Sequence, residues 1–181
     1  IMGKTSKLIE KNIRVIKNFP KKGILFQDIF PLTSKPSIFN SIINEICLEI
    51  KRDKISKVIG IESRGFIFAS AAALKSKLPF VPIRKPNKLP GPVYKHKYQL
   101  EYGTDEIQIQ KNAITTNDKI LIVDDLIATG GTALAAHKLV SKHNSKKISF
   151  FFVINLENLK GTSLLLYLIH ISEPTRPSQI S

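Results

Sequence analysis

Two adjacent aspartates, Asp124 and Asp125, are followed closely by a turn of small residues. The four apolar residues before them, 120–123, are typical of a strand buried on both faces. Glycines at a helix start let backbone N–H groups converge on an anion, and paired carboxylates suit two neighbouring hydroxyls or a hydrated metal ion. This stretch therefore predicts a site for a phosphorylated, hydroxyl-bearing molecule. The turn consists of Ala128, Thr129, Gly130, Gly131 and Thr132.

Two common nucleotide-binding patterns are absent from the sequence. No G-K-[S/T] follows a glycine-rich loop, and G-x-G-x-x-G occurs nowhere. The remaining alternative is a structural turn that caps a helix beside two solvent-facing acids. Acids at a strand end, directly before a Gly-Gly-Thr turn, favour the phosphate site.

The elements that must position this site alternate along the chain. We expect helices over 5–18, 37–51, 65–77 and 132–143, and strands over 24–29, 58–61, 80–83, 107–109, 119–123 and 148–154. Such alternation predicts an α/β fold with a largely parallel sheet, in which ligands bind beyond the carboxyl ends of the strands. The polar stretch 86–102, with its prolines and glycines, predicts a long connection that is either a functional lid or disordered.

Composition fits one globular domain of 181 residues with 43% hydrophobic residues. The net charge of +14 comes from lysines scattered in ones and twos, so nucleic-acid binding is not expected. No apolar run reaches the roughly 20 residues that span a bilayer, and the N-terminus has no signal-peptide pattern. Cys47, the single cysteine, lies in an apolar periodic stretch and predicts a core thiol in a reducing, cytoplasmic compartment.

The run V-D-D-L-I-A-T-G-G-T resembles the phosphoribosyl-pyrophosphate motif of the type I phosphoribosyltransferases. Further segments resemble the members of that family that act on adenine: FPKKGILFQDI (19–29), GIESRGFIF (60–68), PIRKPNKLPGPV (82–93), LEYGTDEIQIQ (100–110) and LENLKG (156–161). The resemblance implies a mostly parallel central sheet flanked by helices, with a small N-terminal hood and a flexible lid. It also implies that adenine and phosphoribosyl pyrophosphate give AMP and pyrophosphate, with Mg²⁺ as cofactor in a homodimer.

Roles of individual residues follow from the same resemblance. Asp124 and Asp125 match the acids that hold the ribose hydroxyls, and residues 128–132 match the 5′-phosphate loop. Glu101, in the lid, is the candidate that hands a proton towards the adenine. The implied pyrophosphate-binding residues are Glu62, Ser63, Arg64, Arg84, Lys85, Lys88 and Tyr102, in a loop where the family often has a non-proline cis peptide. The implied adenine-binding residues are Leu25, Phe26, Gln27 and Leu126.

The protein itself is expected to supply no direct metal ligand, because substrate and water would hold the Mg²⁺, with Asp124 as a possible exception. Arg84 and Lys85 could instead be plain surface charges, and Glu101 a solvated loop acid. A sibling enzyme for another purine or orotate, and a regulator that senses the ligand without catalysis, remain alternatives. We expect one domain over 1–161, with the hood near 8–32 and the core near 33–161. The atypical tail, 162–181, is expected to be non-native or disordered.

Overall fold

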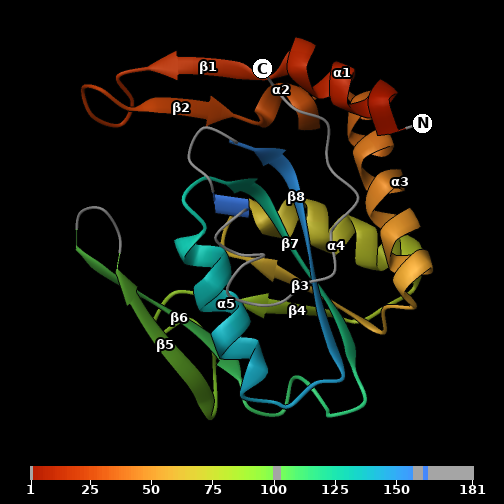
Figure 1. Ribbon diagram of the computed structural model, residues 1–181, viewed down its shortest axis with the longest axis vertical. Coiled ribbons are helices and arrows are strands. Elements are labelled where there is room, and N and C mark those ends of the chain that lie inside the picture. Colours follow the sequence, from red (N-terminus) through yellow and green to blue (C-terminus); the bar gives the residue numbers. More distant parts are fainter. Residues whose placement is uncertain (1, 100–102, 157–160, 163–181) are drawn as a thin grey trace.

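A four-stranded parallel sheet lies at the centre of the computed structural model, which describes residues 2–99, 103–156 and 161–162 (Figure 1). Its strands, in spatial order, are β4 (Phe80–Ile83), β3 (Lys57–Ile61), β7 (Lys119–Ile127) and β8 (Lys147–Asn155). All three neighbouring pairs run parallel. The helices are α1 (Met2–Asn12), α2 (Phe30–Thr33), α3 (Pro36–Asp53), α4 (Gly65–Ser76) and α5 (Gly131–Ser141). The predicted α/β class with a mostly parallel sheet is confirmed.

Apolar side chains cover both faces of the sheet, because successive strand residues point to opposite sides. Val58 and Leu121 belong to one buried cluster, which contains residues of α3 and α4. Ile59 and Ile122 belong to a second cluster, which contains residues of α5. Cys47 packs against the first cluster, as expected of a core thiol. No helix in the described part of the chain combines the length and apolar character needed to cross a membrane.

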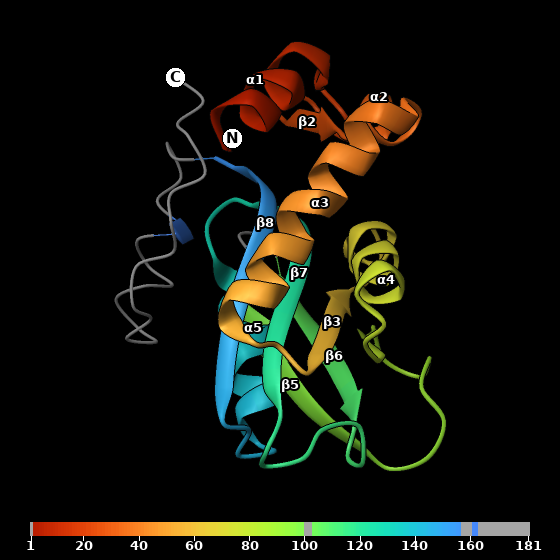
Figure 2. The ribbon, with the colours of Figure 1, turned by 90° about the vertical axis from the view of Figure 1, so that its right-hand side faces the viewer.

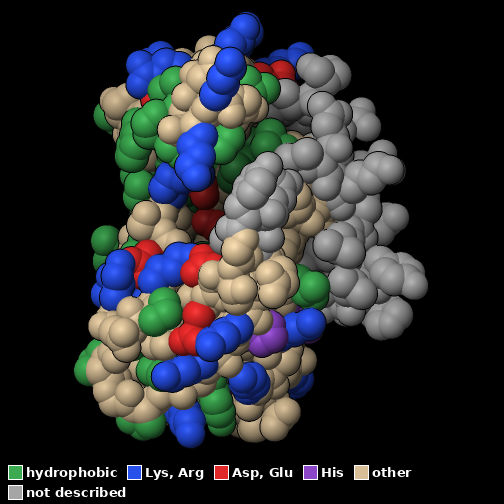
Figure 3. Space-filling model, turned by 90° about the vertical axis from the view of Figure 1, so that its left-hand side faces the viewer, with side chains coloured by type: hydrophobic (Ala, Val, Ile, Leu, Met, Phe, Trp, Pro, Cys, Tyr) green, Lys and Arg blue, Asp and Glu red, His purple; other side chains and the backbone are tan. Residues whose placement is uncertain are grey.

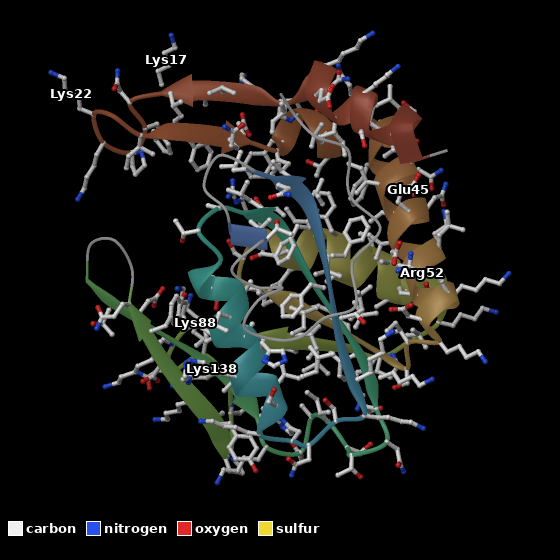
Figure 4. The ribbon with its side chains drawn as sticks, in the orientation of Figure 1. Lys17, Lys22, Glu45, Arg52, Lys88 and Lys138 are labelled. Carbon is white, nitrogen blue, oxygen red and sulfur yellow. The ribbon has the colours of Figure 1, made fainter. Side chains whose placement is uncertain are left out.

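The N-terminal hood lies beyond the carboxyl ends of the strands (Figure 2). It contains an antiparallel hairpin of β1 (Arg14–Lys17) and β2 (Leu25–Asp28), with α1 and α2 beside it. Figure 4 shows Lys17 and Lys22 pointing away from the molecule at the far end of this hairpin. The predicted helix over 5–18 is wrong after Asn12. Arg14 pairs with Asp28, and this long-range contact outweighs the local helical spacing.

A second antiparallel hairpin consists of β5 (Val93–Gln99) and β6 (Thr104–Gln110). The sequence predicted only a connection over 86–102, and this is wrong for residues 93–99. Tyr94 and Tyr98 face the second cluster, while Lys95 and Lys97 between them are exposed. The strand therefore has the period of two that half-buried strands require. Its inward positions are tyrosines separated by lysines, so the sequence lacks the aliphatic alternation that predicts a strand.

Candidate active site

The acid pair lies where β7 loses one of its two neighbours. β7 pairs with β3 only as far as Gly60 and Val123, whereas it pairs with β8 as far as Ile127 and Asn155. Asp124 and Asp125 come directly after the last β3 pair. A space therefore opens beside them at the carboxyl end of the sheet, as predicted for the ligand site.

A cavity of about 400 Å³ occupies this space. Figure 3 shows the hollowed surface between the hood and the β5–β6 hairpin, with acidic side chains in its depth. Its lining contains the predicted residues Glu62, Ser63, Arg64, Lys85, Asp124, Asp125, Leu126, Ala128, Thr129, Gly130, Gly131 and Thr132. Predicted residues that do not line it are Leu25, Phe26, Gln27, Arg84 and Lys88. Glu101 and Tyr102 lie outside the described residues.

Burial sets the ionisation of the two aspartates. It raises the pKa of Asp124 well above the usual value, and the neighbouring charge of Asp125 raises it further. Burial also raises the pKa of Asp125, although the Arg64 guanidinium opposes this effect. Asp125 Oδ2 lies 2.9 Å from Arg64 Nη2 but accepts no hydrogen bond from any described residue. The ligand-free pair therefore favours an incoming cation or hydroxyl donor.

The start of α4 packs tightly against this acid pair. A Cβ atom at Gly65 would lie 2.8 Å from the carbonyl oxygen of Val123 and 2.9 Å from Asp124 Oδ1. Only glycine permits this approach, because the neighbouring backbone oxygen cannot move aside cheaply. The Glu62–Ser63 peptide bond, just before this helix, is cis.

The predicted phosphate loop, residues 128–132, contains Gly130, whose φ of +86° is the left-handed region that favours glycine. Gly130 is the N-cap of α5, so the unpaired N–H groups of the first helical turn face the loop. Gly161 supports the loop from behind, since a Cβ atom there would lie 2.7 Å from the Gly130 nitrogen. The sequence predicted the loop but gave no sign of this support.

Glu62 accepts hydrogen bonds from three basic residues at the edge of the cavity. It accepts hydrogen bonds from Lys88 Nζ at 2.6 Å, the Lys85 backbone N–H at 2.8 Å and Arg84 Nε at 3.3 Å. Burial raises the pKa of Glu62, but these hydrogen bonds outweigh it and lower the pKa to about 2. Arg84 and Lys88 therefore face an internal carboxylate, which holds them beside the cavity but outside its lining.

Arg64 connects the hood to the acid pair. Its Nη1 donates to the Gln27 carbonyl oxygen at 3.0 Å, and its guanidinium carbon lies 5.0 Å from the centre of the Phe26 ring. Leu25 beside them is 58% exposed. Of the predicted base-reading residues, Leu126 lines the cavity, whereas Phe26 and Gln27 lie outside the lining and contact its Arg64.

Tyr98, Asp105 and Phe152 line the cavity but were not predicted as site residues. Tyr98 and Asp105 are direct partners across the β5–β6 hairpin, so their side chains share one face. Asp105 binds Lys85 Nζ and accepts a hydrogen bond from the Tyr98 hydroxyl at 3.2 Å. Recognising β5 as a strand would have placed Tyr98 on the cavity side.

The donor set of the site fits a hydrated Mg²⁺ ion. Hard divalent cations prefer carboxylate, carbonyl and water oxygens, and Asp125 Oδ2 is a buried carboxylate oxygen without a hydrogen-bond donor among the described residues. Within the same residues, no cluster of three or more His, Cys, Asp or Glu side chains could coordinate a metal. The acid pair would therefore share such an ion with water and a ligand. Chemically, the cavity combines anion-binding N–H groups, hydroxyl acceptors and cationic side chains.

Known proteins resemble this chain in sequence and in fold. Residues 35–165 match the phosphoribosyl transferase domain. The chain is 45% identical over 160 residues to the adenine phosphoribosyltransferase of Candida albicans, covering 88% of this chain and 85% of the relative.

Two solved structures share the fold. The first is adenine phosphoribosyltransferase from Saccharomyces cerevisiae complexed with D-2,5-dideoxy-2,5-imino-altritol 1,6-bisphosphate and adenine (TM-score 0.84, 40% identity, 89% of this chain and 94% of that chain). The second is the adenine phosphoribosyl transferase of Trypanosoma brucei in complex with AMP, pyrophosphate and ribose-5-phosphate. Its TM-score is 0.83 at 28% identity, and the match covers 91% of this chain and 73% of that chain.

Proposed function

The chain belongs to the adenine phosphoribosyltransferases, and from this membership we propose that it transfers the 5-phosphoribosyl group of phosphoribosyl pyrophosphate to adenine. AMP and pyrophosphate are the products, and the reaction salvages a purine. The observation that carries the proposal is the cavity at the end of β7, where the acid pair and the phosphate loop share one lining. The relatives from S. cerevisiae and T. brucei bind adenine, AMP, pyrophosphate and ribose-5-phosphate on this fold.

The N–H donors and the carboxylates of the cavity bind different parts of the substrate. The N–H groups of 128–132 hold the 5′-phosphate, and Asp124 and Asp125 accept hydrogen bonds from the ribose hydroxyls. The bond from the ribose C1 to the diphosphate oxygen breaks as the bond from C1 to adenine N9 forms, and the N9 proton is released. The two carboxylates stabilise the positive charge that develops on the ribose in between.

The leaving diphosphate requires cations. Arg64 and Lys85 are the basic residues among the described lining of the cavity, and Glu62 holds Arg84 and Lys88 at its edge. A Mg²⁺ ion held by the substrate, water and the acid pair would neutralise further phosphate charge. Adenine would lie below Phe26 and Gln27 and against Leu126, with Tyr102 near the diphosphate. Glu101 would hand a proton towards the adenine and take one back as the N9 proton leaves, so that the adenine ring of the AMP formed is neutral. A homodimer and a cytoplasmic location are also part of this proposal.

A coupled assay that offers adenine, hypoxanthine, guanine or orotate with phosphoribosyl pyrophosphate and Mg²⁺ tests the proposal. We expect turnover with adenine and at least about 100-fold less with the other bases, since a site built to pair with one polar edge rejects others strongly. Turnover of hypoxanthine without adenine would identify a sibling enzyme. Tight binding of phosphoribosyl pyrophosphate without turnover of any base would identify a regulator.

A further inference from the structure

The cavity contains a carboxylate that the proposed reaction does not use. Asp105 projects into it from the start of β6, and its Oδ2 binds Lys85 Nζ and the Tyr98 hydroxyl. All three side chains line the cavity. Tyr98 also reaches the phosphate loop, since Thr132 Oγ1 lies 3.5 Å from its hydroxyl oxygen.

The Lys85–Asp105 pair is charged near neutral pH. Burial raises the pKa of Asp105, but the hydrogen bonds from Lys85, the Glu106 N–H and Tyr98, together with the Lys85 charge, outweigh burial, and the pKa falls below the usual value. Burial likewise lowers the pKa of Lys85, but the hydrogen bonds and charge interactions with Asp105 and Tyr98 together outweigh burial, and the pKa of Lys85 rises above the usual value. A negative charge here is unfavourable for binding a substrate with several phosphate charges. Substrate affinity therefore does not explain why the Asp105 carboxylate lines the cavity.

The mobility of Lys85, the ion-pair partner of Asp105, offers an explanation. Lys85 and Arg64 are the cations among the described lining residues, and they are held differently. Arg64 is fixed by Asp125, by the Gln27 carbonyl and by the Phe26 ring. The Lys85 ammonium has a long flexible stem, and its side chain is 38% exposed. Lys85 can therefore move between two anionic partners at low cost.

We propose that Asp105 is a positioning residue that competes with bound pyrophosphate for the Lys85 ammonium and thereby weakens the retention of this product. The inference rests on the proposed function, which brings a diphosphate to this cavity. While the diphosphate is bound, it takes Lys85, and the Tyr98 hydroxyl continues to hold the Asp105 carboxylate. When pyrophosphate begins to leave, the Lys85–Asp105 pair re-forms and lowers the cost of release. No covalent bond changes in this exchange.

Product inhibition by inorganic pyrophosphate, with Mg²⁺ and the full chain, tests this idea. Asp105→Asn should lower the inhibition constant of pyrophosphate about 5-fold, because Lys85 loses its competing partner. In a Lys85→Gln background the same substitution should change the constant less than about 2-fold, since coupling requires both partners. Tyr98→Phe should act in the opposite direction, because it removes the donor that shares Asp105 with Lys85. That variant also keeps the test decisive if Asp105→Asn folds poorly.

A matched control is available in the Lys147–Asp53 pair, whose side chains are 42% and 19% exposed, against 38% and 23% for Lys85 and Asp105. Asp53→Asn should leave the inhibition constant unchanged. The competition is overturned if Asp105→Asn weakens pyrophosphate binding, leaves it unchanged, or tightens it equally without Lys85. A wild-type chain that forms no AMP would instead contradict the proposed function. An active wild type with an unaltered Asp105→Asn constant would contradict the competition alone.

Discussion

Arg64 and Asp125 form an ion pair, with 2.9 Å between Nη2 and Oδ2, at the base of the cavity. The same guanidinium donates to the Gln27 carbonyl in the hood. One side chain therefore connects the segment predicted to read the base with the acid predicted to hold the ribose.

Replacing Arg64 by Gln should lower the free energy of unfolding by about 2 kcal/mol, because Asp125 keeps a buried charge without its cation. Amide hydrogen exchange in β1 and β2 should also accelerate, since the hood loses a contact with the core. Urea unfolding and exchange mass spectrometry measure the two effects. Arg52→Gln, in a half-exposed surface pair with Glu49, is the control and should cost less than about 0.5 kcal/mol. Equal costs for the two variants would show that the Arg64 contact contributes no more than a surface pair.

Replacing Asp124 and Asp125 together by Asn should reduce kcat/KM at least about 100-fold while stability at pH 7 holds or rises. Stability should not fall, because the raised pKa of Asp124 means that the folded state disfavours the charged carboxylate. The native state then binds more protons than the unfolded chain between the ordinary value of 3.8 and the raised one. Wild-type stability therefore falls as pH rises through that window, and the double variant should lack this fall.

Asp118, just before the same strand, provides the opposite control. Burial raises its pKa, but hydrogen bonds from the Thr115 N–H and from Lys57 lower it to about 2. Asp118→Asn should therefore lower stability at pH 7 and leave kcat/KM within about 2-fold, because Asp118 does not line the cavity. Full activity in the Asp124 and Asp125 double variant would remove the pair from the site.

Replacing Glu62 by Gln should lower the free energy of unfolding at pH 7 by about 2 kcal/mol. This value is smaller than the pKa shift alone would give, because solvent screens the half-exposed Lys88 partner. The pKa of Glu62 falls from the usual 4.5 to about 2, so its contribution is complete above pH 4.5 and is lost as pH falls towards 2. Urea unfolding at several pH values should show the gap between wild type and variant closing in that window. A gap that stays constant with pH would assign the loss to packing.

Replacing Gly130 by Ala should raise the KM for phosphoribosyl pyrophosphate about 10-fold and change the KM for adenine little. The new Cβ would strain a φ of +86° and lie 2.7 Å from the Gly161 carbonyl oxygen, which displaces the phosphate loop. Gly91→Ala is the matched control, because Gly91 has a φ of +72° and a Cβ atom there would meet no atom within 4 Å among the described residues. Steady-state kinetics should therefore find an unchanged KM in that control. Equal KM values in the two variants would contradict a role for the loop backbone.

Local sequence patterns predicted the parts of the site that depend on neighbours in the chain. The apolar run before Asp124 and the small residues from Ala128 onward predicted the strand and one shared site, and the structure places the two acids and residues 128–132 in one cavity lining. Long-range contacts decided the rest. Residues 14–17 form a strand because β2 lies beside them, and Gly161 reaches the loop through the tertiary fold alone. Tyr98 and Asp105 were missed because their hairpin was not recognised, and the roles of Glu101 and Tyr102 stay predictions.

The hood and the phosphate loop come from segments that lie far apart in the chain. The hood hairpin is complete by Asp28, whereas the loop begins about one hundred residues later, at Ala128. Under the proposed roles of these two segments, substitutions that alter the choice of nucleobase can accumulate in the first segment while binding of the sugar phosphate stays intact. The same proposed roles predict that base choice and sugar-phosphate binding can change independently in evolution, and that a hood exchanged between relatives should bring its base preference with it.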